Sequence, residues 1–184
     1  MHQPLLLHLF TLVVFEEIII LITSTSRSNG THMVHTSFEQ DIFIATSSEK
    51  VTDFLVGLNN HSQIHPLIVK VEQTASSTAE DGTEIKHYKI RDRMKQGPFT
   101  IAFTYDVMIG INTQGEIVSD AYQKPGIHLH NITRCLPEGN GTRVTEHVEI
   151  TAPRLLIQTV FKQGLASHKE MFANLKKALE NIDA

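Results

Sequence analysis

Residue types that often carry chemistry are scarce in this chain of 184 residues. Tryptophan is absent and Cys135 is the only cysteine, which excludes an indole platform and an intramolecular disulfide. A single cysteine fits a reducing compartment but is also compatible with secretion. Lysine and arginine number 16 against 20 acidic residues and are spread thinly, which leaves no concentrated basic surface for a phosphate backbone. We therefore expect no nucleic-acid partner.

The chain also lacks the short motifs that mark common enzyme classes. It contains no Gly-x-Ser-x-Gly elbow, no phosphate-binding loop and no Ser–His–Asp order. Its 11 histidines raise the question of a metal site, because His128 and His130 share a strand face beside His147. That face could equally be a solvated outer one, and neither a cysteine nor a spaced acid completes a ligand set. We predict neither a metal site nor a cofactor.

The first 32 residues differ from the rest. Two apolar runs, at 5–15 and 18–22, flank Glu16 and Glu17. A membrane span needs about 20 mostly apolar residues, and each acid near its middle costs about 2–3 kcal/mol of insertion free energy. Three alternatives stay open: a membrane anchor through residues 4–23, a cleaved signal peptide, and an extension outside the fold. Translation from Met33 would give a cytoplasmic protein, whereas the full chain would be membrane-associated or secretory.

Residues 33–184 have the pattern of one domain that begins with a strand and two short helices. Segment 35–45 alternates in polarity like a strand. Thr46 to Glu49 then has the pattern of a capping box that opens a helix, and Pro66 ends a second, shorter one. Six further strands are predicted at 67–74, 83–95, 99–111, 116–122, 127–136 and 142–152.

A long amphipathic helix is predicted at the C-terminal end. Pro153 is placed to start it, because a proline in the first helical turn has no N–H to satisfy. Gly164 interrupts the helix propensity and marks either a close approach to the sheet or a kink. One helix can cover a seven-stranded antiparallel sheet only if the sheet curves around it, which leaves an internal pocket. The apolar stripe comprises Phe161, Leu165, His168, Phe172, Leu175, Leu179 and Ile182.

Four short stretches then suggest a family. Residues 42–45 run into 47–51, Pro66 closes the second helix, 141–144 open the last strand, and 175–180 lie near the C-terminus. In these features the chain resembles the START-like superfamily, also called the SRPBCC or helix-grip fold, and within it the polyketide cyclase/dehydrase and lipid-transport branch.

The resemblance implies an α+β helix-grip fold: a curved seven-stranded antiparallel sheet around a long C-terminal helix, with two short helices after the first strand. It also implies a ligand-binding domain at 33–184. The expected function is binding or transfer of a small hydrophobic ligand, such as a lipid, a sterol or a secondary metabolite. Residues 75–82 hold a single glycine where the pollen-allergen-like branch has a glycine-rich loop, so the kind of ligand stays open.

The predicted strand faces give the candidate residues. Glu146 shares a face with Val148, and an acid in such apolar surroundings should have a raised pKa and could act as acid or base. Tyr88, Asp92 and Tyr105 could face it and orient a polar group of the ligand. The residues expected to line the pocket are Ile42, Ile44, Tyr88, Ile90, Phe103, Tyr105, Val148, Phe161 and Leu165.

Two alternatives to a simple binding protein stay open. The first is a small cyclase, dehydratase or hydrolase that acts on an apolar or polyketide-like substrate, with Glu146 and a tyrosine or histidine as acid and base; Tyr88 and Tyr105 are the tyrosine candidates. The second is a partner-binding module whose cavity is filled by its own side chains. The sequence favours the binding protein over catalysis and leaves the oligomeric state open.

Overall fold

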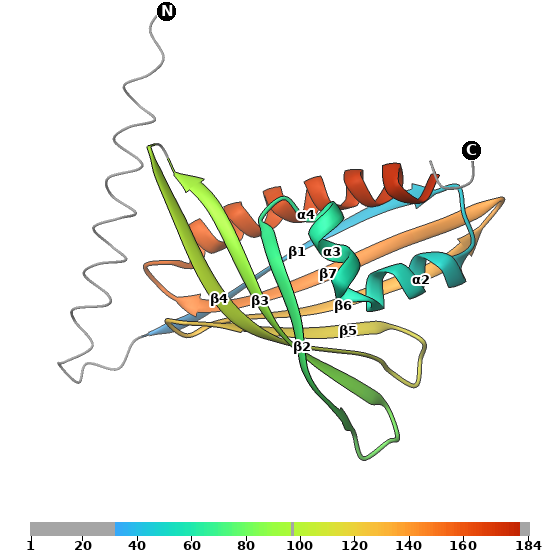
Figure 1. The fold of residues 1–184 in the computed structure, drawn as a ribbon, viewed down its shortest axis with the longest axis horizontal. Coiled ribbons are helices and arrows are strands. Elements are labelled where there is room, and N and C mark those ends of the chain that lie inside the picture. Colours follow the sequence, from blue (N-terminus) through green and yellow to red (C-terminus); the bar gives the residue numbers. More distant parts are fainter. Residues whose placement is uncertain (1–31, 97, 181–184) are drawn as a thin grey trace, which may run out of the picture.

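The structure is a computed structural model that describes residues 32–96 and 98–180 (Figure 1). The helical elements are α2 (Ser48–Val56), the 3-10 helix η1 (Leu58–Asn60), α3 (His61–Ile64) and α4 (Ile157–Glu180). The strands are β1 (Met33–Ile44), β2 (Ile68–Thr78), β3 (Glu84–Gln96), β4 (Phe99–Ile111), β5 (Ile117–Gln123), β6 (Ile127–Glu138) and β7 (Gly141–Pro153). This order confirms the predicted succession of strand, short helices, six strands and long helix. The predicted N-terminal alternatives fall on residues outside the described ones.

The seven strands form one antiparallel sheet in the order β1-β7-β6-β5-β4-β3-β2. The first strand pairs with the last, so Phe38 lies opposite Val148, and hairpins join the others in chain order. Figure 1 shows β2, β3 and β4 running steeply across the direction of β5, β6 and β7. The sheet is therefore strongly curved, as predicted, and α4 lies on its concave side.

The long helix α4 packs directly on β1 and β7. Pro153 is the last residue of β7, and a turn leads to the helix start at Ile157, so the prediction that Pro153 opens the helix was wrong. The reason is that Pro153 still pairs with Met33 across the sheet. A Cβ placed on Gly164 would lie 3.7 Å from Phe38 and 3.8 Å from Ile150. Gly164 thus marks a close approach to the sheet within a continuous helix, rather than a kink.

Strict alternation gives the sheet two unlike faces. Along β7, Val144, Glu146 and Val148 are buried on the concave side, whereas the residues between them are more exposed. His128, His130 and His147 lie on the outer side. His128 and His130 contact Asp120 at 2.7 and 3.0 Å, and His147 contacts Glu39 at 2.9 Å. No group of three or more metal-ligating side chains that could hold a metal ion occurs among the described residues. Within the same residues, no helix has the length and apolar character needed to cross a bilayer.

Candidate ligand-binding site

A cavity of about 210 Å³ lies between the concave face of the sheet, α4, and the α2–α3 segment. Because one water molecule needs only about 10–15 Å³ of such volume, the space is large enough for a small organic molecule. Its walls are mainly apolar, with contributions such as Leu58, Ile90, Phe103, Leu129 and Phe172. The alternative of a cavity filled by the protein's own side chains is therefore not supported.

The cavity brings together some of the predicted site residues and leaves others out. Ile90, Phe103, Tyr105 and Val148 line it, as does Glu146. The remaining predictions concern residues used in packing outside the lining: Ile42, Ile44, Tyr88, Phe161 and Leu165.

The omitted residues of β1 and α4 are explained by where α4 sits. Ile42 and Ile44 belong to the cluster in which Leu175 and Leu179 of α4 pack on the sheet, and Ile44 is fully buried there. Phe161 packs at the other end of the helix, with its ring 6.1 Å from that of Phe38 in an edge-to-face arrangement. Because α4 lies directly on β1, the side chains between them fill the space. The cavity forms instead beneath β3 to β7, where the sheet curves away from the helix. The five residues thus lie outside the lining of this cavity.

A buried ion pair stands in the cavity wall. The Nδ1 atom of His168 lies 2.9 Å from a carboxylate oxygen of Glu146, whose side chain is only 1% exposed. Gln40 and Asn131 each donate a side-chain amide hydrogen bond of 2.7 Å to the same carboxylate. Because a carboxylate accepts, Nδ1 of His168 carries the hydrogen. Among the described residues, Nε2 of His168 has no hydrogen-bond partner, which leaves that atom for a ligand.

The pKa of Glu146 moves in the direction opposite to the prediction. Burial raises it, as expected, but the charge of His168 and the hydrogen bonds from His168, Asn131 and Gln40 outweigh burial, so the pKa lies below its ordinary value. Burial alone would lower the pKa of His168, whereas the charge and hydrogen bond of Glu146 raise it. Glu146 is thus held as a carboxylate that orients His168, and His168 is the member of the pair that can exchange a proton.

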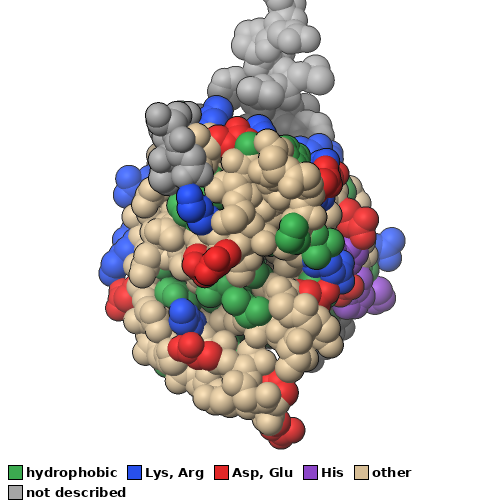
Figure 2. All heavy atoms as spheres, turned by 90° about the vertical axis from the view of Figure 1, so that its right-hand side faces the viewer, with side chains coloured by type: hydrophobic (Ala, Val, Ile, Leu, Met, Phe, Trp, Pro, Cys, Tyr) green, Lys and Arg blue, Asp and Glu red, His purple; other side chains and the backbone are tan. Residues whose placement is uncertain are grey.

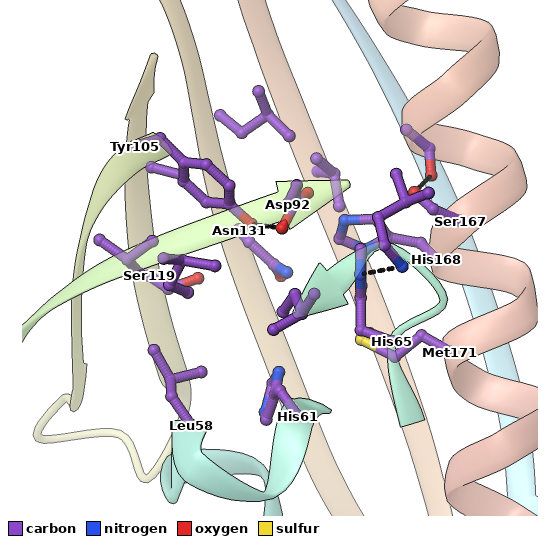
Figure 3. Close-up of a pocket in the computed structure, with 18 of the residues that line it drawn as sticks. Leu58, His61, His65, Asp92, Tyr105, Ser119, Asn131, Ser167, His168 and Met171 are labelled. Carbon is purple, nitrogen blue, oxygen red and sulfur yellow. Dashed lines mark hydrogen bonds between the residues drawn. The ribbon is translucent and has the colours of Figure 1, made fainter. Parts of the chain in front are cut away.

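Two further histidines line the cavity beside this pair (Figure 3). The ring of His65 meets that of His168 edge-on, with centroids 6.1 Å apart. Burial, together with the nearby His168 and His61, lowers the pKa of His65 to about 3. Burial also lowers the pKa of His61, whose Nε2 lies 2.8 Å from the carbonyl oxygen of Leu55. Both rings are therefore neutral near pH 7.

A second acidic group lies on β3. The hydroxyl of Tyr105 donates a hydrogen bond of 3.3 Å to Asp92, as the dashed line in Figure 3 shows. Burial raises the pKa of Asp92 to about 6, even though the hydrogen bond from Tyr105 lowers it. Burial and the neighbouring Asp92 raise the pKa of Tyr105 well above its ordinary value. The acid with the raised pKa that sequence reasoning assigned to Glu146 is therefore Asp92.

Sequence reasoning missed three residues around the ion pair. His168 was assigned to the packing stripe of α4, although a histidine among phenylalanines and leucines on such a stripe marks a buried polar group that needs a partner. Asn131 and Gln40 carry the same signal, because each shares a strand face with apolar neighbours. His61 and His65 gave no such signal, since they lie in and just after the four-residue helix α3, which is too short to show periodicity.

Comparisons with known proteins bear on the fold. No family model matches the sequence, and no curated protein matches it either. Solved structures do match. A protein from Thermus thermophilus has a TM-score of 0.64 at 15% identity, over 81% of this chain and 100% of its own.

Two further matches carry descriptive names. The Zhui aromatase/cyclase from Streptomyces sp. R1128 has a TM-score of 0.58 at 14% identity, over 82% of this chain and 96% of its own. A START superfamily protein from Mycobacterium smegmatis has a TM-score of 0.54 at 14% identity, over 82% and 99%. At such low identities the matches show the fold alone. The matched folds agree with the sheet, helix order and curvature described above. The chain therefore has the START-like, helix-grip fold.

Proposed function

We propose that this protein binds a small, largely apolar molecule in its cavity and holds an oxygen-bearing group of that molecule at His168. The observation that carries the proposal is an open, mainly apolar cavity with an oriented ion pair in its wall. Burial of the ligand's apolar surface would supply affinity at about 25 cal/mol per Å². The Glu146–His168 pair would supply orientation, because Nε2 is the ring atom without a partner among the described residues.

The preferred polar group follows from the protonation of His168. Glu146 favours the imidazolium form, in which Nε2 donates a hydrogen bond. A carbonyl or hydroxyl oxygen on the ligand accepts such a bond, whereas a second cation would meet repulsion. The ligand class is thus a neutral or anionic apolar molecule with an acceptor oxygen, which includes fatty acids, sterols and aromatic ketones.

Incubation of the full chain with a total lipid and metabolite extract, followed by native mass spectrometry, tests this proposal. We expect recovery of one apolar molecule per chain and its loss, or much weaker retention, in a folded His168→Phe, which keeps an aromatic ring but removes both nitrogens. Recovery of nothing apolar by a folded wild-type chain would contradict the proposal.

A second candidate function, acid–base catalysis on the bound molecule, is favoured by one specific observation. The same cavity holds Asp92, with a pKa near 6, and His168, whose pKa is raised by Glu146. Such groups can give and take protons near neutral pH, as cyclisation or dehydration requires. The Zhui aromatase/cyclase shares this architecture.

The binding experiment separates the two functions. A catalyst would convert extract components, for example by loss of water, in the wild type but not in Asp92→Asn, while Asp92→Asn would still capture the substrate. A carrier would release its ligand unchanged from both proteins.

A further inference from the structure

One end of the fold differs in charge from the rest of the chain. The antiparallel order brings four parts together there: the start of β1, the β3–β4 turn, the β5–β6 turn and the β7–α4 connection, at the left of Figure 1. Two contacts join three of these parts, the start of β1, the β5–β6 turn and the β7–α4 connection. The amide of Arg154 donates a 3.0 Å hydrogen bond to the carbonyl oxygen of His32, and the Met33 side chain lies against Gly126. We call this region the basic end.

The basic end carries exposed cations and few acids. Arg93, Lys124 and Arg154 are exposed on it. The stretches 32–36, 93–104, 121–130 and 152–163 contain no aspartate or glutamate. Glu72, on the neighbouring edge strand, is paired with Lys70 at 2.7 Å. The net charge of the whole chain is −4, so an end whose exposed charges are positive is a local feature.

The opposite end shows the contrast. Figure 2 looks at that end and shows acidic side chains among the basic ones. The acidic residues in its turns and at the start of α2 are Glu49, Glu80, Asp81, Glu84, Glu116 and Glu138. The two ends therefore differ: acids and cations are mixed at this end, whereas the exposed charges named at the basic end are positive.

Large apolar side chains are exposed at the same end. Phe99 is 58% exposed, Leu155 57% and Met33 38%. The chain that precedes Met33 contains the apolar runs 5–15 and 18–22, and it joins the fold at this point. Exposed apolar groups and cations on the same end match the chemistry of a bilayer with anionic headgroups, because apolar side chains insert at the headgroup level and cations meet the lipid charge. A nucleic acid or acidic protein would explain the cations but not the apolar groups.

We propose that the basic end docks on the surface of an anionic lipid bilayer. Gln123, Ile127 and Val160 line the cavity and lie in the elements that border this end, so a docked bilayer would lie close to the cavity wall. The inference rests on charge and exposure at the basic end and stands whether or not the cavity holds a lipid.

Flotation of the full chain with phosphatidylcholine vesicles, with and without phosphatidylserine, tests the proposal. We expect binding to the anionic vesicles that falls as salt rises. A basic residue near an anionic surface contributes about fivefold in binding, so Lys124→Glu/Arg154→Glu should weaken it by at least about 25-fold. Lys50→Glu/Lys177→Glu, which makes the same change in net charge at the opposite end, should leave binding within about twofold.

Three results would overturn the proposal: no binding of the wild type to anionic vesicles, equal binding to neutral ones, or equal loss in both charge-reversed variants. Phe99→Ser/Leu155→Ser separates a bilayer from other polyanions. A lipid surface predicts weaker binding by this variant. Unchanged binding would mean attraction by charge alone and would count against membrane docking.

Discussion

At the scale of residues, Glu146 and His168 stabilise each other's charged forms. The folded pKa of Glu146 lies below 4.5, so its contribution to stability is present above pH 4.5 and is lost as pH falls through the folded pKa. The folded pKa of His168 lies above 6.5, so its contribution is complete below pH 6.5 and is lost as pH rises through the folded pKa. The pair should therefore stabilise the fold most between pH 4.5 and 6.5.

Removing one partner should expose the cost of the other's burial. His168→Phe leaves the Glu146 carboxylate with two amide donors and no cation, and loss of one partner of a buried pair costs about 3–5 kcal/mol. We expect urea unfolding within that pH window to show a decrease in the free energy of unfolding of this order. Equal stability of the variant and the wild type would mean that the two side chains are not paired.

The pKa of His168 gives a more local test. Glu146→Gln removes the charge that raises it and keeps the burial that lowers it. NMR titration of the imidazole should therefore show a lower pKa in Glu146→Gln than in the wild type. A pKa that stays the same would rule out Glu146 as its main perturbing group.

His65 should make the protein sensitive to acid. Its folded pKa is about 3 against an ordinary value of 6.5, so between these values the unfolded chain binds a proton that the folded chain does not. As pH falls across this window, the wild type should lose free energy of unfolding relative to His65→Gln by about 1.4 kcal/mol per pH unit. Chemical denaturation at several pH values measures this, and parallel curves would contradict it.

Removing the hydroxyl of Tyr105 tests its effect on the pKa of Asp92. The hydrogen bond from Tyr105 lowers the pKa of Asp92 from the level that burial would set. Tyr105→Phe should therefore raise the pKa of Asp92 above about 6. Carboxyl-carbon NMR titration would detect this, and a fall in the pKa would show that the hydroxyl does not act on the charged form.

Residue roles could be predicted from the sequence only where alternation fixes the face. Tyr105, Phe103 and Val148 were assigned to the concave side correctly because strand period sets that side. The Glu146–His168 contact could not be derived, since it joins a strand and a helix whose relative rotation depends on packing. The sign of the Glu146 pKa shift depended on that missing partner.

At the scale of elements, α4 is continuous through its glycine. A methyl group at position 164 would meet Phe38 and Ile150 at ordinary contact distances. Gly164→Ala should therefore raise the free energy of unfolding by about 0.5–1 kcal/mol, through helix propensity.

A glycine in the sheet supplies the comparison. A Cβ on Gly110 would lie 2.6 Å from the carbonyl oxygen of Glu84, so Gly110→Ala should destabilise the protein. Thermal melts of both variants decide the point. A loss of stability in Gly164→Ala would show that the helix lies closer to the sheet than the contact distances allow.

Element order could be read from the sequence, but some element boundaries could not. Polarity alternation located every strand within a few residues, because each strand has one buried face. The predicted start of α4 was wrong because a proline is acceptable both in the first turn of a helix and at the end of a strand. The register between Pro153 and Met33, a long-range pairing, decided the choice.

At the scale of the molecule, the curvature of the sheet creates the cavity. One helix packs on β1 and β7, and the remaining strands curl over a space that no second helix of comparable length fills among the described residues. This architecture was predictable from a count of strands and helices, because only a curved sheet buries its apolar face against one helix. The size of the cavity and the chemistry of its walls were not, since they depend on how far each strand departs from α4.

The central claim, that the cavity holds an apolar ligand, is tested most directly by filling the cavity. Ala121 lines it, so Ala121→Phe should occupy space that a ligand needs, whereas Ala166→Phe places the same side chain on the exposed face of α4. Native mass spectrometry after incubation with the lipid and metabolite extract should show an apolar molecule on the wild type and on Ala166→Phe, and none on a folded Ala121→Phe. Equal capture by all three proteins would place the ligand elsewhere and contradict the account.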